Sequence, residues 1–106
     1  MAGPTGNFYN DDNSVCIKIK SANESTGRLS GTLEENSYAY PVVGGYSHEE
    51  DGLTTRVNFS TENSGEKDDW AGAIDRWNNF QNLRVIRTHT YPDGLMRSVG
   101  YELKRR

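Results

Sequence analysis

The segment from residue 53 to residue 74 constrains the fold more than any other part of this chain. Its first half alternates between less polar and more polar side chains with a period of two, which is typical of a half-buried strand. The less polar set is Leu53, Thr55, Val57 and Phe59. Residues 61–65 are of types that form tight turns, and Trp70 and Gly72 then share one face of a second strand. We therefore predict a hairpin in which Phe59 and Trp70 face the same interior.

Short segments of the same kind, separated by turn residues, fill the rest of the chain. A length of 106 residues with 11 glycines suits one domain of short strands and many turns. The further strands are expected at residues 6–10, 15–20, 27–33, 38–46, 80–89 and 98–104. Pro41 predicts an edge or a bulge in its strand, and Trp77 is expected in a linker. We predict an all-β fold, an eight-stranded antiparallel up-and-down β-barrel over residues 6–104 that follows a disordered segment at residues 1–5.

Composition and charge argue against several classes of function. The net charge is −3 and the sequence pI about 5.3, which argues against a nucleic-acid-binding surface. We find no apolar run long enough to span a membrane and no signal peptide, so the location is left open between cytoplasmic and secreted after processing. Cys16 is the only cysteine and is expected to be a buried small apolar residue.

The polar residues do not form a recognisable catalytic pattern. Serine, histidine and aspartate are scattered, and no nucleophile elbow or phosphate-binding glycine loop occurs. The acidic run His48-Glu49-Glu50-Asp51 matches no metal-binding loop and is expected to be a solvated turn. We therefore expect no enzyme activity, no cofactor and no metal site.

Six short motifs occur in an order and spacing similar to those of the avidin and streptavidin family, from Gly6 to Lys104. They are Gly6-x-Phe8-Tyr9-Asn10, Gly27-x-Leu29-x-Gly31-Thr32, Tyr40-Pro41-Val42-Val43-Gly44-Gly45-Tyr46, Trp70-x-Gly72, Arg87-Thr88 and Val99-Gly100. The resemblance implies an eight-stranded barrel that binds biotin at one open end. It also implies a ligand-binding set made of Asn10, Asn13, Ser14, Leu33, Glu35, Phe59, Glu66, Asp68, Trp70, Arg84, Ile86 and Glu102.

Within that set, the polar end of the implied pocket only partly matches the family. Asn10 matches the family's asparagine. The family's serine position is ambiguous: counting residues from Asn10 gives Ser14, whereas the alternation of the following strand favours Asn13 as the residue that faces the pocket. Leu33 stands where the family uses a tyrosine and cannot donate a hydrogen bond. Glu102 stands at the family's Asp or Asn position.

The remainder of the implied pocket departs further from the family. Phe59 replaces a tryptophan conservatively and Trp70 matches, but Arg84 aligns with another family tryptophan. Glu66 and Asp68 align with small hydroxyl residues near the ligand's tail, where Glu35 adds a third carboxylate. These carboxylates would repel the carboxylate of biotin, and each lost buried partner costs roughly 1–3 kcal/mol. We therefore expect weak biotin binding or none.

Three functions follow for a barrel with such a pocket. The first is small-molecule binding of the avidin type, and the second is binding of a sugar or another polyol by Arg84 and the carboxylates. The third is a structural or interaction protein, in which Arg84 leans inward and fills the pocket with a network of ion pairs. An outward apolar patch is also expected on the last two strands, where it would mediate homo-oligomer formation. Its residues are Leu83, Val85, Val99, Tyr101 and Leu103.

Overall fold

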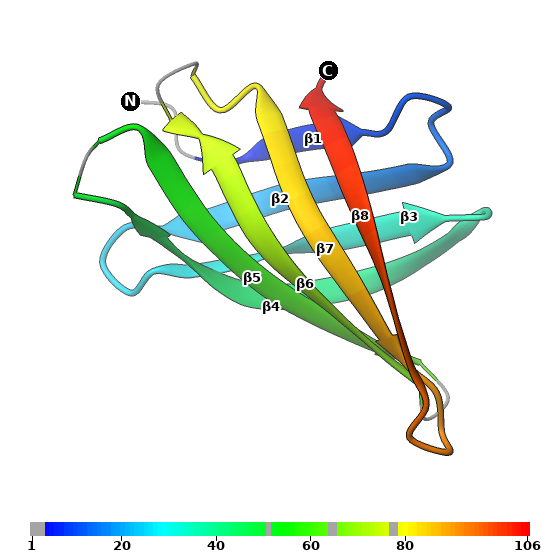
Figure 1. Ribbon diagram of the computed structural model, residues 1–106. Coiled ribbons are helices and arrows are strands. Elements are labelled where there is room, and N and C mark those ends of the chain that lie inside the picture. Colours follow the sequence, from blue (N-terminus) through cyan, green and yellow to red (C-terminus); the bar gives the residue numbers. More distant parts are fainter. Residues whose placement is uncertain (1–3, 51, 64–65, 77–78) are drawn as a thin grey trace.

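Eight antiparallel strands, each paired with its neighbours in the sequence, close into a barrel in the computed structural model (Figure 1). The strands are β1 (Gly6–Tyr9), β2 (Val15–Asn23), β3 (Arg28–Glu35), β4 (Tyr38–His48), β5 (Thr54–Asn63), β6 (Glu66–Asp75), β7 (Asn82–Thr90) and β8 (Met96–Arg105). The structure describes residues 4–50, 52–63, 66–76 and 79–106, and these ranges contain no α-helix. The predicted fold class is confirmed, while Trp77 lies outside the described residues.

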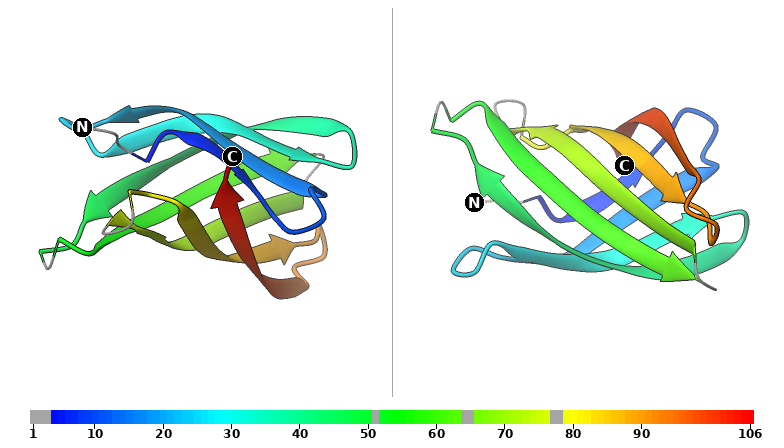
Figure 2. Two further views of the ribbon diagram at one scale, coloured as in Figure 1. Left: turned by 90° about the horizontal axis from the view of Figure 1, so that it is seen from above. Right: turned by 60° about the horizontal axis from the view of Figure 1, so that its bottom comes forward.

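The barrel closes through a short seam between its first and last strands. β1 pairs with β2 along its whole length, but it meets β8 only at Phe8↔Arg105 and Tyr9↔Lys104. Near the seam Pro4 is buried, and the Thr5 carbonyl accepts a hydrogen bond from Arg105 Nη1 at 2.6 Å. The C-terminal end of β8 therefore lies beside β1, as the views in Figures 1 and 2 agree.

The connections between strands gather at two ends of the barrel. The turns after β1, β3 and β7 lie at one end, where β5 also ends and β6 begins, and we call this end the mouth (Figure 1). The β3–β4 turn is tight because Asn36 and Ser37 both adopt positive φ, at 52° and 68°. The β2–β3 turn lies at the opposite end, together with the beginning of β1 (Figure 2).

The core fills the inside of the barrel with side chains that alternate along each strand. Phe59 and Trp70 are register partners on β5 and β6, and their rings stack with centroids 5.8 Å apart. The prediction that both aromatics face inward from paired strands is thus confirmed. The predicted turn is wrong for residues 61–63, which continue β5, and residues 64 and 65 lie outside the described residues. The other buried apolar side chains around them include Phe8, Ile17, Ile19, Leu29, Leu33, Val42, Val57, Ile74, Leu83, Val85 and Leu103.

Glycines allow neighbouring strands to approach closely inside the sheet. A Cβ atom added to Gly72 on β6 would collide with the carbonyl oxygen of Arg84 on β7, and one added to Gly44 on β4 would collide with that of Asn58 on β5. Gly100 on β8 is different, since nothing lies within 4 Å of an added Cβ atom. A side chain is therefore excluded at Gly72 by the neighbouring strand, whereas Gly100 has room for one.

The predicted outward patch on β7 and β8 is wrong for its largest members. Leu83, Val85 and Leu103 are buried in the core, and the ring of Tyr101 lies 5.6 Å from that of Trp70. The strand register explains this. Trp70 points inward, and it pairs with Arg87 on β7, which pairs in turn with Val99 on β8. Register partners point to the same face of a sheet. Odd-numbered residues of β7 and β8 therefore point inward. Val99 is nevertheless half exposed, since it lies near the mouth.

Candidate functional site

A cavity of about 150 Å³ lies at the mouth of the barrel, above the aromatic core. Its walls come from β3, β4, β5, β6 and β7, and they are mostly charged or polar. The lining residues are Glu35, Tyr40, Thr61, Glu66, Asp68, Arg87 and His89. We refer to it as the charged cavity.

Arg87 spans the barrel and joins three strands in this cavity. Its Nε and Nη2 donate to the two oxygens of Asp68 on β6, at 2.9 and 2.8 Å. Its Nη1 and Nη2 donate to the two oxygens of Glu35 on β3, at 2.7 and 3.0 Å. The planar fork of a guanidinium suits two such bidentate contacts, which are stronger than neutral hydrogen bonds. Arg87 therefore ties β7 to β3 across the interior.

The same guanidinium covers the floor of the cavity. Its central carbon lies 5.0 Å from the ring centroid of Trp70, within the range of a cation–π contact. Phe59, the register partner of Trp70 on β5, stacks against the same indole. An incoming ligand would meet Arg87 before it could reach the indole.

His89 lies between two carboxylates of β6. Its Nδ1 is 2.6 Å from Asp68 Oδ1, and its Nε2 is 2.9 Å from Glu66 Oε1. The ring of Tyr91 packs edge-on against it at 4.6 Å. Because carboxylates only accept hydrogen bonds, both contacts are satisfied together when the imidazole is protonated.

Ion pairing shifts the proton affinities in the cavity. Hydrogen bonds to Glu66 and then to Asp68 raise the pKa of His89 above its ordinary value. Burial alone would raise the pKa of Asp68, but hydrogen bonds from Arg87 and His89 outweigh it and lower that pKa. Burial alone would lower the pKa of Arg87, but the hydrogen bonds to Asp68 and Glu35 raise it. The network therefore favours the charged form of each of these groups.

Two buried polar atoms at or below the cavity have no partner among the described residues. They are the hydroxyl oxygen of Thr61, a residue only 6% exposed that lines the cavity, and the indole nitrogen of Trp70. A buried hydroxyl without a partner costs roughly 1–3 kcal/mol. Thr61 thus offers a hydrogen bond to whatever enters the cavity.

Comparison with known structures agrees with this geometry. Core-bradavidin matches with a TM-score of 0.77 and 17% identity, over 94% of this chain and 97% of that one. Bradavidin2, solved as its biotin complex, matches with a TM-score of 0.74 and 18% identity, over 100% of this chain and 99% of that one. The chain has the avidin fold. A point variant of shwanavidin, also solved with biotin, matches this avidin barrel with a TM-score of 0.71 and 16% identity, over 100% of both chains. No protein-family model and no curated protein sequence matches the chain.

The avidin barrel brings half of the predicted site residues together. Glu35, Glu66 and Asp68 line the charged cavity. Phe59 and Trp70 form the aromatic stack beneath it, and Leu33 is fully buried in the core.

Three other predicted residues point away from the interior of the avidin barrel. The side chain of Arg84 is 75% exposed and pairs with Glu102, itself 55% exposed, at 3.8 Å on the outer surface. Ile86 is 58% exposed on the same surface. The expectation that Arg84 leans inward is wrong because it alternates with Leu83 and Val85, which are buried.

The polar residues of the β1–β2 turn belong to the rim of the avidin barrel. Asn10 accepts a hydrogen bond from the Val15 amide and donates one to Ser14 Oγ, each at 3.0 Å. Asn13, at a φ of 61°, is exposed and accepts a hydrogen bond from Arg106. The preference for Asn13 over Ser14 as the residue that faces the interior is therefore wrong, since both are exposed.

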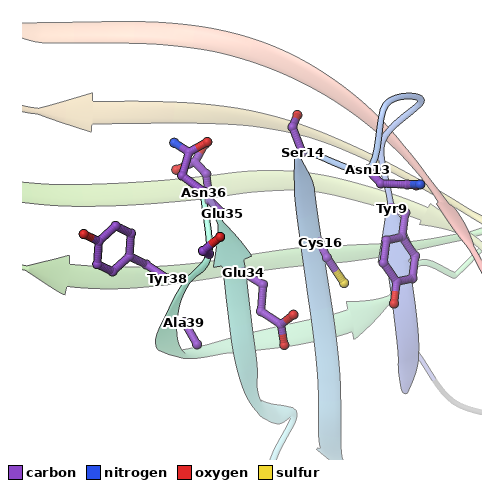
Figure 3. A pocket seen from close by; sticks show the side chains of 10 residues that line it. Tyr9, Asn13, Ser14, Cys16, Glu34, Glu35, Asn36, Tyr38 and Ala39 are labelled. Atoms are coloured by element: carbon purple, nitrogen blue, oxygen red, sulfur yellow. The ribbon is translucent and has the colours of Figure 1, made fainter.

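Asn13 and Ser14 instead border an outer cleft of about 300 Å³ between the β1–β2 and β3–β4 turns. Figure 3 shows its lining, in which Tyr9, Cys16 and Glu34 lie side by side on adjacent strands. Cys16 is buried as expected, and burial raises the pKa of its thiol. Such a thiol is a weak nucleophile.

Sequence reasoning missed the central member of the charged cavity. The sequence predicts a strand for Arg87 and His89 and a turn for Thr61, which the structure places in β5, and it assigns none of the three to the site. Arg87 is in phase with the apolar Leu83 and Val85, so the alternation of β7 does indicate that it points inward. Nothing local to the sequence indicates its partner Glu35.

Two further findings concern the described ranges of the chain. They contain no group of three or more His, Cys, Asp or Glu side chains that could hold a metal ion. They also contain no helix with the length and apolar character needed to cross a membrane.

Proposed function

We propose that this avidin barrel is a non-enzymatic binding protein for a small polar molecule, which enters the charged cavity at its mouth. One observation carries the proposal: a cavity of about 150 Å³ is walled by charged side chains and contains the buried, unpartnered hydroxyl of Thr61. Ligand sites are commonly concave, with a few converging polar groups over an apolar base. Here that base is the aromatic stack under Arg87.

We propose further that biotin binds weakly or not at all. Two of the similar proteins were solved with biotin, but the chemistry of this cavity opposes that ligand. The apolar ring body of biotin would have to displace Arg87 from the face of Trp70 and break four charged hydrogen bonds. Its carboxylate would then lie among Glu35, Glu66 and Asp68, where like charges repel.

A calorimetric titration with biotin, together with tryptophan fluorescence, tests this proposal. We expect no saturable heat at micromolar biotin. The double variant Arg87→Met/Glu35→Met should bind more tightly than the parent because the face of Trp70 is uncovered without leaving a bare charge. The matched variant Arg84→Met removes an exposed arginine of the same strand and should change nothing. A Kd below about 1 μM for the unaltered chain would overturn the proposal.

A sugar is the second candidate ligand, and the outer cleft favours it. This cleft combines amide, hydroxyl and carboxylate groups with tyrosine rings at its border (Figure 3). Tyr38 is 66% exposed and stacks on Tyr40 at 6.3 Å, which presents a flat face to solvent. A glycan array, with Tyr38→Ala as the variant, tests this alternative. Binding that the variant abolishes would support it, and an array without signal would remove it.

We also infer that copies of the chain associate through the outer surface of β5 to β8. A shallow hollow of about 630 Å³ on this surface is lined by small residues around the exposed Ile86, beside the Arg84–Glu102 pair. Small residues let a second sheet approach closely, and an exposed apolar side chain at the centre favours a protein contact. This surface replaces the patch predicted from the sequence.

A further inference from the structure

We propose that the ligand of the charged cavity is a small organic cation with N–H donors, namely a primary ammonium compound. This inference rests on the proposed function, because it assigns a chemical class to the ligand of the same cavity. It comes from three properties of the lining: which hydrogen-bonding groups are already used, which remain free, and how the charges sum.

The charged donors of the cavity, Arg87 and His89, are already engaged. Four charged hydrogen bonds from Arg87 go to Glu35 and Asp68. Both ring nitrogens of His89 contact carboxylates of β6. A ligand that needs donors from the protein, such as an anion, would therefore have to break existing ion pairs.

The charged atom of the lining that remains free is an acceptor. Glu66 contacts His89 through Oε1, and within the described residues its second oxygen has no hydrogen-bond partner. The hydroxyl oxygen of Thr61 is buried and unpartnered, and it can accept as well as donate. An ammonium group supplies three N–H donors and no acceptor, so it matches this lining. Tyr40 also lines the cavity, and an aromatic ring attracts a cation.

The charges of the lining point to the same class. Three carboxylates, Glu35, Glu66 and Asp68, face one permanent cation, Arg87, and His89. The lining therefore keeps an excess negative charge even when the imidazole is protonated. Arg97, the register partner of His89 on β8, shares the inward face of His89, but it is exposed and does not line the cavity, so water screens its charge. A monovalent cation would neutralise the excess.

The size of the cavity limits the ligand. Its volume of about 150 Å³ is below the roughly 300–1,000 Å³ of sites for drug-sized molecules. Short-chain amines are therefore more suitable than large polycations.

The test compares three probes of one size and three charges: propylammonium, 1-propanol and propanoate. Each is titrated into the ¹⁵N- and methyl-labelled protein by NMR, with the Thr61 methyl group and the Glu66 amide as reporters. Propylammonium should bind saturably and shift both signals, whereas propanoate should not. Glu66→Gln and Thr61→Val should each weaken propylammonium binding, the former roughly tenfold or more.

Asp69→Asn is the matched control, because Asp69 is the neighbouring exposed carboxylate on the outer face of β6. It removes the same charge and should leave the affinity within about twofold. If Asp69→Asn and Glu66→Gln weakened propylammonium binding equally, the effect would come from the overall negative charge of the protein, and the inference would be overturned. Tighter binding of propanol or propanoate at the same reporters would overturn the cation class but keep the proposed function. If no probe, sugar or biotin shifted the reporters, the proposed function itself would fail.

Discussion

Replacing Arg87 by methionine is the sharpest test of the network at the mouth. The change leaves Glu35 without its arginine, whereas Asp68 keeps His89. Removing one partner of a buried ion pair typically costs 3–5 kcal/mol. The side chains of Arg87 and Glu35 are 14% and 21% exposed, so water reaches the stranded carboxylate and the lower end of this range applies, about 3 kcal/mol. For a domain of this size that corresponds to a fall in Tm of roughly 12–24 °C.

Urea unfolding followed by tryptophan fluorescence measures this loss. Two comparisons isolate the cause. Arg87→Met/Glu35→Met removes both charges and should regain stability to within about 1 kcal/mol of the parent, since a buried ion pair is often replaceable by apolar residues. Arg84→Met removes an exposed cation and should cost less than about 0.5 kcal/mol. A loss below about 1 kcal/mol for Arg87→Met, or an equal loss for Arg84→Met, would refute the reasoning.

Three further predictions concern packing, pH and association. Gly72→Ala should destabilise the fold by more than about 2 kcal/mol in urea unfolding, because the added Cβ collides with a neighbouring strand. Gly100→Ala should be nearly neutral. Comparable effects of the two changes would contradict the described register. The pKa of His89 is raised in the fold, so its stabilising contribution is fully present below the unfolded pKa of about 6.5 and is lost as pH rises through the folded value. In His89→Gln the free energy of unfolding should therefore fall less steeply above about pH 6.5 than in the parent. An unchanged pH profile would show that His89 does not cause this fall. Light scattering should show that Ile86→Glu reduces the molar mass of any assembly, whereas Leu95→Glu, exposed in the β7–β8 turn, should not; equal effects would place the contact elsewhere.

Period-two alternation was sufficient to predict the barrel and its aromatic core. Phe59 and Trp70 follow the alternation of their own strands, so their inward direction follows from local sequence, although the predicted turn began too early because β5 continues to Asn63. The error over Arg84 had a different origin. Aligning this position with a family tryptophan overrode the alternation, which places Arg84 outside and Arg87 inside.

Other features of the mouth depend on contacts that local sequence does not encode. Arg87 and Glu35 are 52 residues apart, and only closure of the barrel brings them together. The direction of Asn13 depends on a single positive φ in the β1–β2 turn, which alternation cannot supply. Predictions for rim residues are for this reason weaker than predictions for strand interiors.

The hydrogen bond between Arg105 and the Thr5 carbonyl has a consequence for engineering this barrel. The first strand and the end of the last strand lie side by side (Figures 1 and 2). A short peptide linker could therefore join them into a circular backbone, and the loop-closure entropy of so short a connection would be small. New termini could then be opened in the exposed β2–β3 turn, away from the mouth, and a cargo or a surface anchor could be attached there while the mouth stays accessible.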